Sequence, residues 1–311
     1  MFVDISSLSV VDLLRSGALL VAFLATAFAD KRGQASVWLK ADAVACAGFG
    51  LGLYLFPGVF INYMVDGETD VLHIHMTRVV GAMAVVTVAV YYHLAIKDKD
   101  NAPLGSWIVS RTLGSAVLFA VAALGANTYG KGSTHFNQKF VSFACFGNLL
   151  VFLGYLIHML RFNDYVNEGR RGTDSARDCT RFHLLVDLLL TFPQVLFVFG
   201  FPQTHFDLSG LKADGIHLFL GRMLACQLLP MLLFGIQALQ GSNEENRRAF
   251  FLVKILGFLS VLPWACYYGY YHNMVPTFTR AFMIHQGLAL VALINAFVGA
   301  FYRPGDARKR K

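Results

Sequence analysis

Four ionisable side chains stand within apolar stretches of the sequence, where a charged group is costly. They are Asp42 and Arg111 in the first half of the chain and Asp187 and Lys254 in the second. A charge in a membrane-spanning helix costs about 3 kcal/mol on insertion scales, so such groups usually pair or line a water-filled cavity. We therefore expect two ion pairs, Asp42–Arg111 and Asp187–Lys254. Each pair could gate a proton or ion relay, but a purely structural link between two helices is the favoured interpretation.

Histidine and arginine side chains gather in two further segments, both next to carboxylates. They are His73, His75 and Arg78 in the first half and His217 and Arg222 in the second. Such a mouth on the outer side of a membrane could bind a cation or sense pH. Residues two apart on a helix point about 200° apart, so His73 and His75 would not share one metal ion. We predict a polar, solvated lip without a metal site, where the two arginines could hold lipid headgroups or an anionic ligand.

Motifs for enzymatic chemistry are missing from the sequence. It contains no HExxH, GxSxG or GxxxxGK[ST] pattern, so no catalytic residue is assigned. His158 and His285 fall at different depths, which argues against a haem held by two histidines. The five cysteines include no CxxC pair, which favours free thiols over a zinc site or a disulfide framework. A non-enzymatic protein without a cofactor is therefore expected, and a membrane-embedded oxidoreductase is the least favoured alternative.

The elements that must position these residues follow from composition. The chain has 311 residues, of which 56% are hydrophobic and 14% are charged, whereas about a quarter of a soluble globular chain is charged. Apolar runs of about 20 residues recur along it, the length that crosses a bilayer. Lipid excludes unpaired backbone groups, so we predict an all-α integral membrane protein with about nine transmembrane helices. The spans cover approximately residues 13–29, 41–63, 79–96, 107–125, 139–160, 182–201, 215–238, 249–269 and 281–302.

The distribution of basic residues predicts the orientation. Most of the 26 lysines and arginines fall in alternate loops, which places those loops and the carboxyl terminus in the cytosol and the amino terminus outside or in a lumen. The net charge of +7 thus reflects membrane topology, and no nucleic-acid partner is expected. Cleavage of a signal peptide at Ala27–Ala29 would invert this pattern, so an uncleaved first helix is favoured. The terminal RKRK resembles a retrieval signal and favours the endoplasmic reticulum or another endomembrane, although contact with anionic lipids explains it equally.

The two halves of the chain repeat one another in order. Asp42, Pro57, His73, Arg78, Arg111 and Gly114 correspond to Asp187, Pro202, His217, Arg222, Lys254 and Gly257. Self-similarity of this kind indicates duplication. The chain divides into an amino-terminal helix and loop (1–40), a four-helix unit (41–162), a cytosolic linker (163–181), a second four-helix unit (182–303) and a basic cytosolic tail (304–311). An even number of spans gives both units the same orientation, as in parallel-repeat transporters.

Short motifs in the first unit suggest a family. They are Phe56–Pro57, Asp66–Gly67, Arg78, Gly81–Ala82 and Arg111, with a weaker echo at Phe201–Pro202, Arg222 and Lys254. With these motifs, residues 40–162 resemble the four-helix membrane proteins called tumour-suppressor-inducible protein eleven. The resemblance implies endomembrane residence and no established catalysis. This chain differs from that family by its duplication and its extra first helix.

Two functions remain open at the level of sequence. A transporter-like carrier of a small solute or ion is favoured by the parallel repeat with its paired intramembrane charges. Pro193 and Pro230 could interrupt spans, but they do not occupy matching positions. A non-catalytic scaffold within the membrane is the alternative. The expected partners are membrane lipids, and a small solute or ion and another membrane protein are further candidates.

Overall fold

A computed structural model describes residues 10–27, 33–91, 102–128, 135–161, 179–241, 244–271 and 280–301. The first half contains α1 (Val10–Ala27), α2 (Gly33–Leu55), α3 (Pro57–Met64), α4 (Val71–Tyr91), α5 (Ala102–Thr128) and α6 (Gln138–Arg161). The second half contains α8 (Cys179–Gly200), α9 (Pro202–Leu208), α10 (Gly215–Gly241), α11 (Glu244–Tyr271) and α12 (Arg280–Phe301). Two short strands, β1 (Val65–Asp66) and β2 (His135–Phe136), pair antiparallel. The tail 304–311 and most of the linker 163–181 lie outside the described residues.

The prediction of an all-α protein is confirmed, and several of its helices are long and apolar enough to cross a membrane. Five stretches of the described residues are long and apolar enough to cross a membrane: Trp107–Gly125, Phe140–Arg161, Thr180–Gly200, Gly215–Ile236 and Phe250–Gly269. The bent pair of α2 and α3 would make a sixth. Shorter apolar stretches occupy α1, α4 and α12. A helix thus lies over each of the nine predicted ranges, although not every one of these helices reaches full spanning length.

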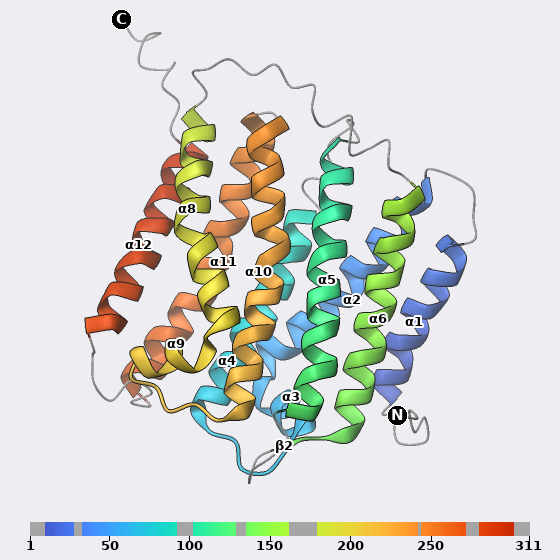
Figure 1. Cartoon of the computed structure of the whole chain (residues 1–311), viewed down its shortest axis with the longest axis horizontal. Helices are drawn as coiled ribbons and strands as arrows, with labels where there is room; N and C mark the ends of the chain where they lie inside the picture. Colours follow the sequence, from blue (N-terminus) through green and yellow to red (C-terminus); the bar gives the residue numbers. More distant parts are fainter. Residues whose placement is uncertain are drawn as a thin grey trace, which may run out of the picture.

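A sharp bend divides the predicted span 41–63, which is therefore not one straight helix. The axes of α2 and α3 meet at 103°, because Pro57 begins α3 and Phe56 before it has a non-helical backbone. Proline disfavours helical geometry in the preceding residue and is well suited to a first helical position. Pro202 begins α9 after Phe201 in the same way. Figure 1 shows α3, α9 and β2 together at one end of the bundle, which we call the α3/α9 end.

The helices of the two halves interlock at the centre of the bundle. Helix α10 packs against α4, α5 and α8, and α4 packs against α2, α10 and α11. The pairs α5–α6 and α11–α12 lie to either side, and α1 covers α2 and α6 (Figure 1). Each half therefore supplies a central helix that packs against its own half and against two helices of the other half. Side chains of α4 therefore lie close to side chains of the second half, and sites can form between them.

Glycines permit the closest helix contacts. A Cβ atom on Gly81 of α4 would lie 2.6 Å from the Gly50 carbonyl oxygen and 2.6 Å from the Tyr54 nitrogen, both in the backbone of α2. On α5, a Cβ atom on Gly114 would lie 2.2 Å from Pro230 Cγ of α10. These glycines let α2 approach α4 and let α5 approach α10, which sets the positions of the charged side chains on those helices.

Candidate functional site

The first predicted pair lies inside the bundle and links three helices. Arg111 of α5 donates a hydrogen bond from Nη2 to Asp42 Oδ2 of α2 at 2.7 Å. The hydroxyl of Tyr155 in α6 donates to the same oxygen at 2.5 Å, and Cys46 Sγ lies 3.3 Å from Asp42 Oδ1. Both charged residues are buried. A buried charge is tolerated when it is paired and its remaining lone pairs are satisfied, and Asp42 meets both conditions.

The second predicted pair is braced by fewer groups. The ammonium of Lys254 in α11 donates to Asp187 Oδ1 in α8, and also to Thr191 Oγ1 at 2.9 Å. Asp187 is buried, whereas 14% of the Lys254 side chain is exposed. The structure therefore brings together the partners of both predicted pairs, but only the second pair faces a sizeable pocket.

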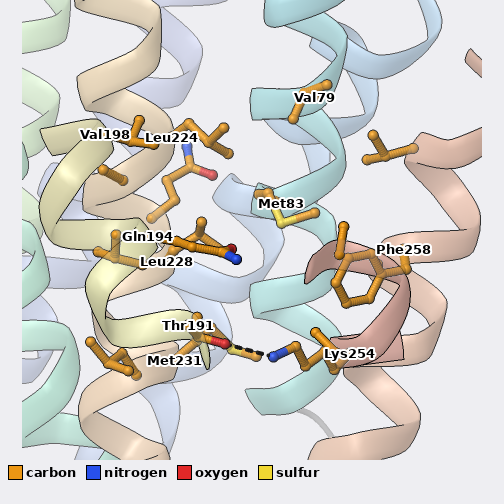
Figure 2. Close-up of a pocket in the computed structure, with 18 of the residues that line it drawn as sticks. Val79, Met83, Thr191, Gln194, Val198, Leu224, Leu228, Met231, Lys254 and Phe258 are labelled. Carbon is orange, nitrogen blue, oxygen red and sulfur yellow. Dashed lines mark hydrogen bonds between the residues drawn. The ribbon is translucent and has the colours of Figure 1, made fainter. Parts of the chain in front are cut away.

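That pocket has a volume of about 320 Å³ and lies between α4 and the helices of the second half. Its walls are mainly apolar and include Met83 of α4 and Leu228 of α10, with Gln194 of α8 among the few polar side chains (Figure 2). Ligand sites typically combine an apolar concave surface with a few polar groups that fix orientation. This pocket could not be predicted from the sequence, because its walls come from helices whose adjacency cannot be seen in the order of the chain.

A much smaller pocket of about 70 Å³ adjoins the Asp42–Arg111 pair. Gln227 of α10 lines both pockets, so the two charge pairs lie on either side of the same helix. The volume of the smaller pocket suffices for a few water molecules and is well below that of typical ligand sites. The larger pocket is therefore the candidate site for a solute.

The histidine segments form reciprocal caps at the starts of α4 and α10. Asp70 Oδ1 accepts the His73 backbone N–H at 2.9 Å, and the Asp70 backbone N–H donates to His73 Nδ1 at 3.1 Å. Asp214 and His217 make the same two bonds, each at 3.1 Å. This is the geometry of a capping box with histidine in the place of the usual glutamate. Because Nδ1 accepts a hydrogen bond from a backbone N–H in both rings, Nε2 carries the ring hydrogen.

The two caps are joined across the halves of the chain. His73 Nε2 donates to Asp214 Oδ1, and His217 Nε2 donates to Asp70 Oδ1, each at 3.2 Å. The rings stack with their centroids 3.6 Å apart. We call these four residues the His–Asp crosslink. The prediction of a solvated lip is wrong for both histidines, which are 2% exposed, because each ring is covered by the other and by the ends of α4 and α10.

Asp70, His73 and His217 are the described residues whose donor atoms lie close enough together to hold a metal ion, within 4.8 Å of one another. A ring nitrogen binds a metal along its lone pair, in the plane of the ring. Two rings stacked 3.6 Å apart do not point their lone pairs at one ion, and each Nδ1 already accepts a backbone N–H. The geometry therefore suits a hydrogen-bonded crosslink better than a metal centre.

The two predicted arginines cap helices and do not lie free at a membrane surface. Arg78 Nε donates to the Tyr54 carbonyl at 3.0 Å, at the end of α2, and Arg222 Nε donates to the Phe199 carbonyl at 3.1 Å, at the end of α8. These carbonyls need partners because each helix stops before a proline. Arg78 is buried and its guanidinium lies 3.6 Å from the ring centre of Trp264, so it does not bind lipid headgroups.

His75 lies apart from the crosslink on α4, as its position two residues after His73 requires. Its ring is buried and lies 5.3 Å from the ring of Tyr268, edge to face. Tyr268 also accepts a hydrogen bond from Arg78 Nη1 at 2.8 Å. The sequence did not identify this contact between α4 and α11, because it depends on the interlocked packing of the two halves.

The crosslink is expected to make stability depend on acid. Burial alone would raise the pKa of Asp70, but hydrogen bonds from His217 and His73 outweigh it and hold the pKa below the ordinary 3.8. Burial is likewise outweighed at Asp214, whose pKa is lowered by His217 and His73. A lowered carboxyl pKa contributes stability above the ordinary pKa, and this stability is lost as the pH falls through the native value. The melting temperature should therefore decrease as the pH falls below about pH 4.

The double variant Asp70→Asn with Asp214→Asn tests this prediction, through thermal unfolding measured from neutral to acid pH. We expect the double variant to lose about 1–2 kcal/mol of unfolding free energy at neutral pH, a modest loss because both carboxylates are partly exposed. Its melting temperature should also fall less steeply as the pH is lowered. Asp207→Asn, on the exposed surface of α9, is the control and should change neither the stability at neutral pH nor its dependence on acid. If the melting temperature of the double variant falls with acid as steeply as that of the unchanged protein, the crosslink does not stabilise the bundle.

The fold and its sites define a class, an all-helical protein with several helices able to cross a membrane and with charges paired inside the bundle. The chain belongs to the family described as Domain of unknown function (DUF8292), whose model matches residues 40–301. The match covers both ion pairs, the larger pocket and the His–Asp crosslink. No curated protein and no solved structure matches the chain. The function must therefore be argued from the sites themselves.

Proposed function

We propose that this protein is an endomembrane carrier of a small solute or ion, with nine spans, an outer or lumenal amino terminus and a cytosolic carboxyl terminus. The observation that carries the proposal is the pocket of about 320 Å³, which is walled by α4 of the first half and by helices of the second. A site between two halves that can move relative to one another is the usual arrangement in carriers built from repeats. In this orientation the α3/α9 end is the outer end.

We further propose that residues 41–162 and 182–303 are two parallel copies of one unit, as the likeness to a four-helix family suggests. Three sets of contacts support this. The ion pairs occur in both units, each unit has an arginine that caps the helix before its proline, and the crosslink is the same contact made twice in opposite directions. A twofold axis along the membrane normal would pass between α4 and α10.

The His–Asp crosslink then serves as the outer closure of the carrier. It joins the outer ends of α4 and α10, which are the two central helices. Access to the pocket from outside requires the crosslink to part, and access from the cytosol does not. The crosslink can part at modest cost because it consists of two hydrogen bonds to carboxylates whose side chains are 58% and 41% exposed.

Accessibility of cysteine to a membrane-impermeant maleimide tests the carrier without knowledge of the solute. Gln194→Cys, placed in the pocket of a cysteine-free variant in sealed proteoliposomes, is expected to react from both sides. Glu68→Cys, on the exposed surface before α4, should react from outside alone. Leu189→Cys, which is 66% exposed on α8 toward the lipid, should react from neither side. Reaction of Gln194→Cys from neither side or from one side only would contradict carriage, and the former would favour the scaffold.

A further inference from the structure

The pocket is elongated along the helices. On α8 its lining runs from Asp187 through Thr191 and Gln194 to Val198, positions that lie on one face of a helix. At a rise of about 1.5 Å per residue this face extends for roughly 16 Å. The lining of α10 from Gly221 to Leu232 has the same length. A ligand that fills the pocket is therefore long and narrow and lies parallel to the helices.

Most of the surface that such a ligand would touch is apolar. Figure 2 shows Met83 and Val79 on α4 facing Leu224 and Leu228 on α10 across the space, and Phe258 closing it from α11. Burial of apolar surface favours a hydrocarbon body, at about 25 cal/mol per Å². Methionine adapts its shape to irregular ligands, so this part of the pocket selects for an apolar body and discriminates weakly among chain shapes.

One end of the pocket offers hydrogen-bond donors. Lys254 uses two of its three ammonium N–H groups, on Asp187 and Thr191. The ammonium makes no third hydrogen bond to a described residue, and its other contact is with the ring of Phe258, whose centre lies 5.9 Å away. Gln194 lies one turn farther along α8 from Thr191 (Figure 2). An ammonium hydrogen needs an acceptor, which an oxygen of a ligand would supply. The head of the ligand is therefore an oxygen-bearing group such as a hydroxyl or a carbonyl.

The charges at this end cancel. Asp187 and Lys254 form one neutral pair, and Thr191 and Gln194 carry no charge. The other titratable residue of the lining, His205, belongs to α9 at the opposite end. A carboxylate beside Lys254 would also meet Asp187, and a cation beside Asp187 would also meet Lys254. Because a buried charge without a counter-charge costs several kcal/mol, a charged head is disfavoured in either sign.

We infer that the pocket binds an uncharged amphipathic molecule, with a long apolar body and a hydroxyl or carbonyl head that accepts a hydrogen bond from Lys254. This inference rests on the proposed function, since it names the class of solute for the same pocket. A neutral lipid of the bilayer and a dissolved apolar alcohol or ketone share this chemistry.

Three photoreactive probes of equal chain length test the class: an alkanol, an alkanoate and an alkyltrimethylammonium, each with a diazirine at mid-chain. They are added to the protein in phosphatidylcholine nanodiscs, and labelled residues are identified by mass spectrometry. Labelling of Met83 and Leu228 is divided by labelling of lipid-facing Leu189, which corrects for partition into the bilayer. We expect this ratio to be about tenfold or more higher for the alkanol than for either charged probe.

Variants of the polar end sharpen the test. Asp187→Asn leaves the Lys254 charge unpaired, so the preference should reverse in favour of the alkanoate. The double variant Asp187→Asn with Lys254→Met removes both charges and should keep the preference for the alkanol, which covers the case in which the single variant fails to fold. Gln194→Leu should weaken labelling by the alkanol without changing the order of the probes.

The outcomes separate the two proposals. A charged probe that labels the pocket as well as the alkanol does would overturn the neutral class and leave the carrier intact. If no probe exceeds the Leu189 background, the pocket binds none of these ligands and the class is again overturned, while cysteine accessibility decides the carrier independently. Native mass spectrometry distinguishes the sources, because a neutral bilayer lipid would remain bound through purification and a dissolved solute would be lost.

Discussion

Arg111→Met is expected to lower the free energy of unfolding by about 3–5 kcal/mol, the largest effect among the changes considered. The substitution leaves the Asp42 carboxylate buried among α2, α5 and α6 without its cation. Tyr155 and Cys46 still donate to it, but hydrogen bonds from neutral groups do not compensate a desolvated charge. Chemical unfolding in mixed micelles, followed by circular dichroism, measures the loss.

The double variant Asp42→Leu with Arg111→Met is the control. Removal of both charges eliminates the unpaired group, and replacement of a buried pair by apolar side chains is often close to neutral. We therefore expect most of the lost stability to return. Lys254→Met should cost less than Arg111→Met, because Asp187 lies beside the larger pocket where water can enter. A double variant no more stable than Arg111→Met would show that the pair contributes nothing through its charges.

Gly81→Ala is expected to cost about 2–3 kcal/mol through overpacking. The added methyl group would lie 2.6 Å from two backbone atoms of α2, the Gly50 oxygen and the Tyr54 nitrogen. Neither atom can turn aside as a flexible side chain could, so α2 and α4 must move apart. The displacement also strains the hydrogen bond from Arg78 to the Tyr54 carbonyl. Thermal unfolding of the purified variant measures the effect.

Gly48→Ala is the matched control on α2, since a Cβ atom there meets nothing within 4 Å. Alanine favours a helix over glycine by about 1 kcal/mol, so this variant should be neutral or more stable. Equal losses in Gly81→Ala and Gly48→Ala would mean that helix propensity, and not the close approach of α2 to α4, determines the result.

The helices could be predicted from the sequence because each contains a long apolar run, which can be recognised without knowing the neighbours of the helix. Helix α4 begins at Val71, eight residues before the start of the predicted span 79–96. Its first turns hold His73, His75 and Arg78, and polar residues suggest a loop when hydropathy is the guide. Here they are buried by caps and contacts that hydropathy does not record.

The two charge pairs could be proposed because the sequence repeats Asp42 and Arg111 as Asp187 and Lys254 at similar depths. The His–Asp crosslink and the larger pocket could not. Both depend on α4 lying beside α10 and α11. A sequence repeat indicates two units, but it does not indicate which helices of the two units are in contact. The caps themselves are visible in the sequence as an aspartate three residues before a histidine at the start of both helices. This spacing is that of a capping box, with histidine in place of glutamate.

The crosslink also has a consequence for the order in which the protein is made. His73 and Asp70 belong to the first half. Asp214, which accepts from His73, follows it by 141 residues, and His217, which donates to Asp70, follows it by 147 residues. Until α10 has left the ribosome, the Nε2 hydrogen of His73 can be satisfied by water alone, and Trp264 is not yet present to cover Arg78. Until the second half has been made, the central helix of the first half is thus incompletely buried. Burial of this helix is completed by the second half, so a chain that ends after the first unit would expose the side chains that the second half covers.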